Sequence, residues 1–195
     1  TAGTRLLIQE DIYDKFLEMV IEHAKCWKEG HTFGGCSMGA IINQGQLDTI
    51  QRYVQIGKEE GARLVLGGNV TQTETGGFFH EATIFADVDN NMRIAQEEIF
   101  GPVMSVIKFK DEADAIRIAN DSPYGLAGAV WSQNINTALK VAAAVRTGTM
   151  GVNNYFGGDI TVPFGGFKES GNGRDKSLHA MDDYTELKTT WIQLG

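Results

Sequence analysis

The segment from Gln96 to Pro102 holds the side chains of this chain that are best suited to bind a ligand. Glu97 and Glu98 are adjacent carboxylates, and Phe100 follows them before a Gly-Pro turn. Glycine permits a sharp turn and proline fixes φ, so we expect Glu98 and Phe100 on a defined loop. A carboxylate accepts two hydrogen bonds from the vicinal hydroxyls of a ribose, and an aromatic ring supports a planar heterocycle. Taken alone, the segment favours a simpler interpretation, an acidic surface turn with one buried Phe.

Three further segments reverse that preference. Residues 1–5 read Thr-Ala-Gly-Thr-Arg and run into three apolar residues. Residues 153–155 read Asn-Asn-Tyr, and residues 163–171 read Pro-Phe-Gly-Gly-Phe-Lys-Glu-Ser-Gly. Residues 184–189 read Tyr-Thr-Glu-Leu-Lys-Thr. In this order and at these separations, the segments resemble the C-terminal part of the NAD(P)-dependent aldehyde dehydrogenase superfamily.

The resemblance covers the whole chain and implies an α/β fold. It implies a parallel-stranded catalytic domain of the aldehyde dehydrogenase type over residues 1–182, followed by an oligomerisation tail with one strand over 183–195. Thr1 matches the position directly after the family's nucleophilic cysteine. The nucleophile is therefore expected immediately before Thr1. Three further features of the family are expected further upstream: the general-base glutamate, the oxyanion-hole asparagine and the dinucleotide fold. By this resemblance the chain as given is expected to be inactive alone.

The resemblance also assigns three residues to the cofactor, NAD or NADP. Glu98 would hold the hydroxyls of the nicotinamide ribose, and Phe100 would pack near the nicotinamide. Gln46 would contact the adenosine half. Thr49 stands where the family commonly has a basic partner, so a solvated amide at a helix start is an equal alternative for Gln46.

Four residues belong to the substrate side by resemblance: Asn153, Tyr155, Asp159 and Phe164. Pro163 and the two glycines after Phe164 set the direction of its ring, which would line the aldehyde tunnel; an ordinary core Phe is the alternative. Asp159 lies in a glycine-rich loop, where it either meets a cationic group of the substrate or is a solvated turn residue. The turn is slightly favoured.

The C-terminal region is expected to build an interface. By resemblance, Arg174 interacts with Glu186, and a bidentate contact of this kind would hold the tail in place. Two exposed charges that contribute little are the alternative. Residues 187–194 suit an edge strand, and in the family this tail joins the sheet of another subunit. A homodimer or homotetramer is therefore implied.

The segments at 153–166 and 170–180 look most like the γ-glutamyl-γ-aminobutyraldehyde dehydrogenases of putrescine breakdown. An aminoaldehyde is the implied substrate, and other aminoaldehydes, including betaine aldehyde, remain open. In the intact enzyme a thiolate would attack the aldehyde, a thiohemiacetal would give hydride to nicotinamide, and water would hydrolyse the thioester. The rival hypothesis is a truncated, non-catalytic relative that acts as an assembly or scaffold module.

The composition indicates which classes of binding partner are unsuited to this chain. The net charge is -8 and the pI is about 5.0, which argues against a nucleic-acid or anionic-membrane surface. No apolar stretch approaches the roughly 20 residues of a membrane span. Two cysteines, Cys26 and Cys36, do not make a disulfide framework, so a cytoplasmic location is expected. Neither cysteine is expected to be the nucleophile. The four histidines show no metal-ligand spacing.

Apolar periodicity and turn residues predict the secondary structure. Helices are expected over 10–28, 46–60, 112–120 and 134–145, and strands over 63–66, 78–85, 103–109, 126–131 and 149–153. From residue 103 the alternation of strand and helix predicts parallel strands joined by right-handed crossovers. Ligands bind at the carboxyl ends of such strands. Asn153 is expected at such an end, whereas Glu98 precedes the first of these strands.

Overall fold

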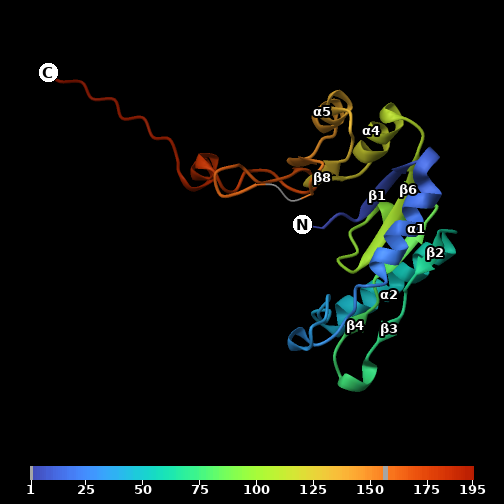
Figure 1. The fold of residues 1–195 in the computed structure, drawn as a ribbon. Coiled ribbons are helices and arrows are strands. Elements are labelled where there is room, and N and C mark those ends of the chain that lie inside the picture. Colours follow the sequence, from blue (N-terminus) through green and yellow to red (C-terminus); the bar gives the residue numbers. More distant parts are fainter. Residues whose placement is uncertain (1, 156–157) are drawn as a thin grey trace. The chain divides into compact units, whose positions relative to one another are not determined.

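The computed structural model describes residues 2–155 and 158–195, so Thr1 lies outside the described residues. The chain divides into two compact units, Thr1–Asp121 and Ser122–Gly195 (Figure 1). The boundary expected at residues 182 and 183 does not coincide with this division, and the separate role of the tail stays a prediction.

A four-stranded sheet in the order β1-β6-β5-β2 forms the centre of the first unit. β1 (Arg5–Gln9), β6 (Val103–Phe109) and β5 (Thr83–Ala86) run parallel, and β2 (Arg63–Leu66) pairs antiparallel with β5. β6 lies between two parallel neighbours, and most of its side chains are buried. That burial explains the nearly continuous apolar run by which the sequence predicted this strand.

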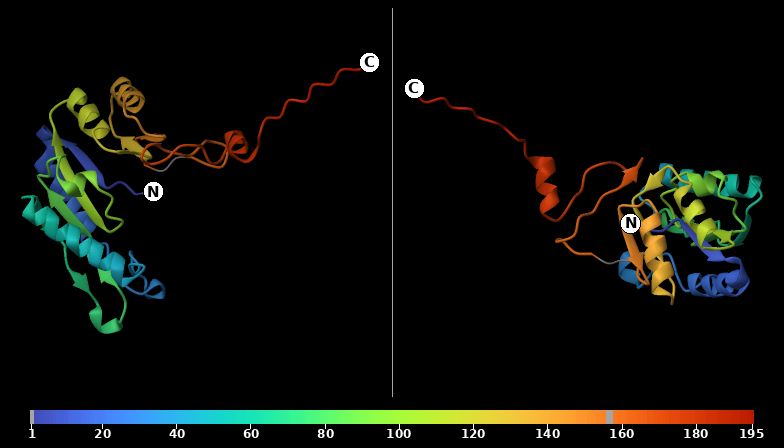
Figure 2. Two further views of the ribbon diagram at one scale, coloured as in Figure 1. Left: turned by 180° about the vertical axis from the view of Figure 1, so that it is seen from behind. Right: turned by 90° about the horizontal axis from the view of Figure 1, so that it is seen from above.

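Helices cover both faces of this sheet, as Figures 1 and 2 show. α1 (Tyr13–Ala24) packs on one face against Ile8, Ile84 and Val106. The other face is covered by three helices: α2 (Gln44–Glu59), α3 (Arg93–Gln96) and α4 (Glu112–Asn120). The caps are local in sequence, since Asn43 and Asp111 accept backbone N–H bonds at the starts of α2 and α4.

One predicted strand is in fact two. β4 (Phe79–His80) pairs with β3 (Val70–Thr71) in a short hairpin, whereas β5 belongs to the central sheet. The chain changes partner at Glu81, whose N–H donates to the carbonyl of Asn69 at 3.1 Å. Apolar periodicity continues through this change of partner, so it could not reveal the break. The sequence also gave no separate signal for β1 or for the short helix α3.

The second unit contains one βαβ motif. β8 (Ala127–Val130) and β9 (Thr149–Val152) are parallel and are connected by α5 (Ile135–Ala144), which Asn134 caps. β7 (Tyr124–Gly125) pairs with β10 (Phe167–Lys168), and a 3-10 helix spans Leu178–Tyr184. The predicted crossover between β6 and β8 in one sheet is wrong, because β6 pairs with β1 and β5 while β8 pairs with β9.

The tail holds no strand in the single chain, and the strand expected at 187–194 through pairing with another subunit stays a prediction. Its apolar side chains are exposed, with Leu187 at 104% and Trp191 at 91% of full exposure. An edge strand exists only when a neighbouring strand supplies its hydrogen bonds, and the described chain supplies none to this tail. Among the described residues, no helix is long and apolar enough to cross a membrane.

Candidate functional site

The loop of residues 97–101 lies at the amino end of β6. The N–H of Val103 donates to the carbonyl of Gly101 at 2.8 Å, and the N–H of Thr83 donates to the carbonyl of Pro102 at 2.8 Å. Because β1 and β6 are parallel and adjacent, the residues that lead into β1 reach the same edge of the sheet. The general expectation of a site at the carboxyl ends of the strands therefore does not describe Glu98.

Glu98 and Phe100 both face solvent on this loop. Glu98 is exposed, and within residues 2–155 and 158–195 its carboxylate has no hydrogen-bond or ion-pair partner. Phe100 is 73% exposed and adopts a left-handed backbone with φ of 53°. A large side chain in this backbone region is strained and persists only where its surroundings impose it. The simpler interpretation of a buried Phe is thus wrong, because the ring is held outward.

Glu97, next in sequence to Glu98, anchors the loop. Its carboxylate accepts two bonds from the Arg93 guanidinium, both at 2.9 Å, and one from the Tyr53 hydroxyl at 2.5 Å. Arg93 and Tyr53 lower the pKa of Glu97, so this carboxyl stays ionised. Two adjacent carboxylates therefore have different environments, one tied to the protein and one open to solvent.

Gln46 lies in the first turn of α2 and is half-buried. Its Nε2 donates to the carbonyl of Ile99 at 2.8 Å and to the carbonyl of Phe100 at 3.1 Å. The alternative of a solvated amide at a helix start is therefore wrong. The helix itself starts at Gln44 with Asn43 as its cap, two residues earlier than the sequence suggested.

Asn153 and Tyr155 follow β9 in the second unit. Asn153 has a φ of 52°, and its carboxamide both accepts from the N–H of Ser132 at 2.9 Å and donates to the carbonyl of Ser132 at 3.0 Å. This pair of bonds ties the carboxyl ends of β8 and β9 together. Tyr155 is half-buried, and burial raises the pKa of its hydroxyl.

Asp159 and Phe164 share Lys176 as a neighbour. Asp159 Oδ1 accepts from the N–H of Thr161 at 2.7 Å and from its hydroxyl at 2.5 Å, which is the turn that the sequence slightly favoured. Those bonds, together with the charge of Lys176, lower the pKa of Asp159. Phe164 is half-buried and exchanges backbone hydrogen bonds with Asp175, while the Lys176 ammonium lies 5.5 Å from the centre of its ring.

Arg174 does not pair with Glu186 in the described part of the chain, contrary to expectation. Its Nη1 donates to the carbonyls of Gly166 at 2.8 Å and Gly173 at 2.6 Å, and its guanidinium lies 4.7 Å from the centre of the Phe167 ring. Glu186 is exposed. The guanidinium is bound within its own loop in this chain, and the role of Arg174 and Glu186 at an interface stays a prediction.

Neither thiol is arranged as a nucleophile. Cys36 donates to the carbonyls of Gly30 at 3.0 Å and His31 at 3.3 Å, which closes the turn after α1. Cys26 is exposed, and its Sγ lies 3.8 Å from the carbonyl oxygen of Glu22. The part of the chain that the structure describes holds no group of three His, Cys, Asp or Glu side chains able to hold a metal.

The comparisons with known proteins identify the family. A sequence model of the aldehyde dehydrogenase family matches residues 1–190. The chain belongs to the aldehyde dehydrogenase family. The NADP/NAD-dependent aldehyde dehydrogenase PuuC of Escherichia coli (strain K12) is 45% identical over 194 residues, covering 99% of this chain and 38% of PuuC. The suspected resemblance is thereby confirmed.

Solved aldehyde dehydrogenases share the fold. KauB from Pseudomonas aeruginosa is 56% identical with a TM-score of 0.96, and the match covers 100% of this chain and 39% of KauB. The P. syringae indole-3-acetaldehyde dehydrogenase AldA, solved with NAD+ and IAA, is 56% identical with a TM-score of 0.95, over 99% of this chain and 39% of AldA. The expected α/β fold is confirmed. This aldehyde dehydrogenase chain spans about two fifths of the length of these relatives.

The expected cofactor of the family, NAD or NADP, fits the residues of the first unit. Glu98 offers an ionisable carboxylate whose oxygens are open to hydroxyl donors, and Phe100 offers an exposed ring on the same rigid loop. The carboxylate suits the ribose hydroxyls, and the aromatic ring suits the planar nicotinamide. Sequence reasoning missed Tyr53, since a single tyrosine on an amphipathic helix gives no signal for a contact 44 positions away.

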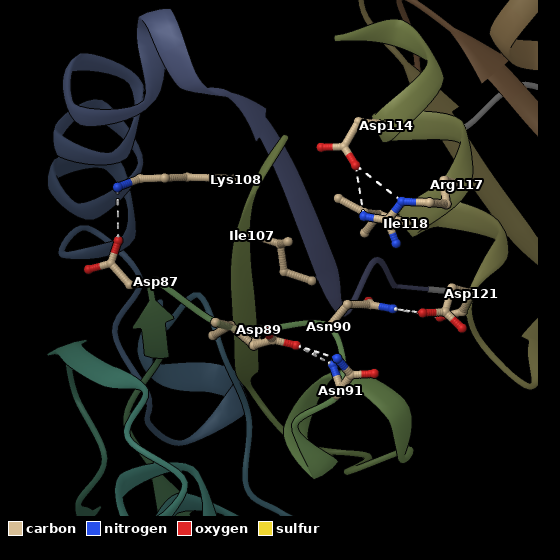
Figure 3. Close-up of a pocket in the computed structure, with 11 residues that line it drawn as sticks. Asp87, Asp89, Asn90, Asn91, Ile107, Lys108, Asp114, Arg117, Ile118 and Asp121 are labelled. Carbon is tan, nitrogen blue, oxygen red and sulfur yellow. Dashed lines mark hydrogen bonds and ion pairs between the residues drawn. The ribbon is translucent and has the colours of Figure 1, made fainter. Parts of the chain in front are cut away.

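A cavity of the first unit lies at the opposite end of the sheet strands, near the carboxyl ends of β5 and β6. It measures about 580 Å³ and includes Ile107 and Lys108 near the carboxyl end of β6. Figure 3 shows two ion pairs in its lining, Lys108 with Asp87 and Arg117 with Asp114, and a hydrogen bond from the Asn90 amide to the Asp121 carboxylate. Glu98 and Phe100 are not among the residues that line this cavity.

Proposed function

We propose that this chain supplies the nicotinamide-ribose contact and part of the substrate tunnel of an NAD(P)-dependent aldehyde dehydrogenase. The observation that carries the proposal is the exposed, unpartnered carboxylate of Glu98 beside the exposed ring of Phe100, on a loop fixed by its neighbours within the described residues. The parallel pairing of β1 with β6 supports it. The residues after the expected nucleophile and the loop with Glu98 lead into adjacent strands at one sheet edge.

The roles of the side chains follow from their chemistry. The cofactor, when bound, accepts a hydride from the aldehyde carbon. Glu98 would accept hydrogen bonds from the ribose hydroxyls and so position the reacting ring, and Phe100 would pack near that ring and exclude water. Cys26 and Cys36 make only local contacts, so neither is proposed as the nucleophile. Phe164 gives the tunnel an apolar wall, and Asn153, Tyr155 and Asp159 border it.

An aminoaldehyde such as γ-glutamyl-γ-aminobutyraldehyde is the proposed substrate. The resemblance of the 153–180 region carries this choice, and the match to PuuC supports it. Indole-3-acetaldehyde is the second candidate, because the indole-3-acetaldehyde dehydrogenase AldA is 56% identical to this chain. The aminoaldehyde carries charged groups, including an ammonium that would meet Asp159. Indole-3-acetaldehyde carries an aromatic ring that would pack against Phe164.

The assembly and location are also proposals. We infer a homodimer or homotetramer in the cytoplasm, with Arg174 and Glu186 near an interface and the exposed apolar tail after residue 186 adding a strand to another subunit's sheet. The free thiols of Cys26 and Cys36 support a reducing compartment. A non-catalytic scaffold module remains the rival, and it predicts no turnover from the full-length protein.

The test is an assay of the full-length protein. Formation of the reduced nicotinamide cofactor would be followed by its absorbance at ~340 nm. The aldehydes would be γ-glutamylaminobutanal, indole-3-acetaldehyde and butanal, each with NAD and with NADP. We expect aldehyde-dependent turnover, with kcat/KM for γ-glutamylaminobutanal at least about 10-fold above that for butanal. Preference for indole-3-acetaldehyde would move the assignment to the second candidate. Absence of turnover with all three aldehydes would favour the scaffold module.

A further inference from the structure

We propose that one face of α2, formed by Gln46, Ile50 and Tyr53, is a template that sets the position of Glu98 and Phe100. These three are positioning residues, and none of them needs to touch the cofactor. The inference rests on the proposed function, because it explains how the ribose contact is held. It gives Gln46 a role different from the adenosine contact implied by the sequence.

The spacing of the three residues puts them on one side of the helix. Positions 46, 50 and 53 are separated by four and three residues, so their side chains line one face of α2. Each of them meets a different part of the loop at 97–101. The helix therefore holds the loop at three successive points.

Gln46 controls the backbone on both sides of Phe100. A carboxamide has two N–H donors, and Nε2 of Gln46 donates to the carbonyls of both Ile99 and Phe100, at 2.8 and 3.1 Å. The first carbonyl belongs to the peptide plane before Phe100 and the second to the plane after it. Fixing both planes fixes φ and ψ of this residue, and φ is 53°, in the left-handed region. Gln46 thus stabilises a conformation that Phe100 would otherwise leave.

Ile50 and Tyr53 hold the two ends of the loop. Ile50 is fully buried, and a Cβ on Gly101 would lie 2.5 Å from its Cγ1, so this glycine allows the loop to lie directly on the helix. The Tyr53 hydroxyl donates to Glu97 at 2.5 Å, and Tyr53 is 8% exposed. Glu97 is thereby fixed, and the exposed carboxylate of the next residue, Glu98, projects from an anchored backbone.

A positioning role and a direct cofactor contact make different predictions for Gln46. If the residue only aims the loop, its loss misplaces the reacting ring while most of the cofactor's binding surface is unchanged. The rate of hydride transfer then falls, and the cofactor dissociation constant changes little. If Gln46 binds the adenosine half directly, the dissociation constant rises and the hydride-transfer rate of the saturated enzyme is unchanged.

The experiment compares Gln46→Met with the control Gln44→Met in the full-length protein. Gln44 lies on the same helix, and within the described residues its amide donates to Asp48, at 2.7 Å, and not to the loop. Cofactor binding would be measured by titration calorimetry and hydride transfer by stopped flow. We expect Gln46→Met to slow hydride transfer about 10- to 100-fold with less than about a threefold change in the dissociation constant, and Gln44→Met to change neither.

A double-mutant cycle with Glu98→Gln makes the test specific. If Gln46 acts through the placement of Glu98, then Gln46→Met slows hydride transfer less than about threefold further in the Glu98→Gln background. Fully additive effects would overturn the inference, as would a raised dissociation constant with unchanged hydride transfer. No effect of Glu98→Gln alone would instead contradict the proposed function, so the two failures are distinguishable.

Two further measurements cover the case in which Gln46→Met does not fold. Tyr53→Phe removes only the hydroxyl that donates to Glu97. We expect this variant to slow hydride transfer less than Gln46→Met does, again with little change in the cofactor dissociation constant. Amide hydrogen exchange of the cofactor-free protein reads the loop directly. The peptide containing residues 97–103 should exchange about 10-fold faster in Tyr53→Phe and in any folded Gln46 variant. Unchanged exchange in this peptide would overturn the template.

Discussion

The backbone N–H of Ser105 donates to the carbonyl oxygen of Thr4 at 3.0 Å. This bond is the first of the parallel ladder between β1 and β6, which continues with the pair Arg5 and Ser105. It places the segment that resembles the family's post-cysteine sequence next to the strand that begins after Glu98. Two motifs about a hundred positions apart in sequence therefore converge on one sheet edge because their strands are neighbours.

Replacement of Asp159 by Asn tests its contribution to substrate choice. The carboxylate is held by Thr161 and lies near Lys176, so part of its charge is already balanced. We expect kcat/KM for γ-glutamylaminobutanal or aminobutanal to fall about 10-fold relative to butanal. Equal losses for both kinds of aldehyde would mean that Asp159 only shapes the loop. No loss for either would identify it as a solvated turn residue.

Gly148 is predicted to be essential for the packing of the second unit. A Cβ at this position would lie 1.6 Å from the carbonyl oxygen of Gly165, a backbone atom that cannot rotate away. Gly148→Ala should therefore destabilise the protein by about 3 kcal/mol or more, measured by urea unfolding. Gly34→Ala is the matched control, because nothing lies within 4 Å of its Cβ position. Similar stability of the two variants would show that the contact at Gly148 is relaxed in solution.

His80 is predicted to make stability depend on pH. It is 2% exposed; Nδ1 lies 2.8 Å from the carbonyl of Glu81 and Nε2 lies 2.7 Å from Nε2 of Gln51. The carbonyl can only accept, so Nδ1 carries the proton and Nε2 accepts from Gln51. Burial lowers the pKa of this imidazole below its ordinary value.

The sign of the pH effect follows from this lowered pKa. Above about pH 6.5 the imidazole is neutral in both states, and the stability is fully present. As the pH falls through the unfolded pKa toward the folded one, the unfolded chain binds more protons and stability is lost. The loss between about pH 7.5 and 5.5 should shrink in His80→Gln, measured by urea unfolding. The exposed His23 provides the control, so an equal reduction in His23→Gln would contradict the assignment to His80.

The sequence predicted those parts of the fold whose signals are local. The central strand β6 and the helix α4 have the predicted bounds because a buried apolar run and an Asp111 cap are both encoded within a few residues. The loop with Glu98 could likewise be found from its Gly-Pro turn. Its outward-facing Phe100 could not, since the cause is a contact with Gln46, more than fifty positions away in sequence.

The remaining differences are also long-range or intermolecular. β8 was expected beside β6 because alternation of strand and helix reports local order but not which strand each one pairs with. Arg174 was expected to pair with Glu186, and in the single chain its guanidinium donates to the carbonyls of Gly166 and Gly173 in its own loop. The strand expected in the tail needs the hydrogen bonds of another subunit's strand, so it stays a prediction.

The central claim is that Glu98 places the nicotinamide for hydride transfer, and single-turnover kinetics of Glu98→Gln in the full-length enzyme test it most directly. The amide keeps the shape of the side chain but weakens its bonds to the ribose hydroxyls. Since a displacement of about 1 Å at a reacting centre can cost on the order of 100-fold, we expect the burst of reduced cofactor to slow by about 10- to 100-fold, with capture of the aldehyde nearly unchanged. A burst rate equal to that of the wild type would contradict the account.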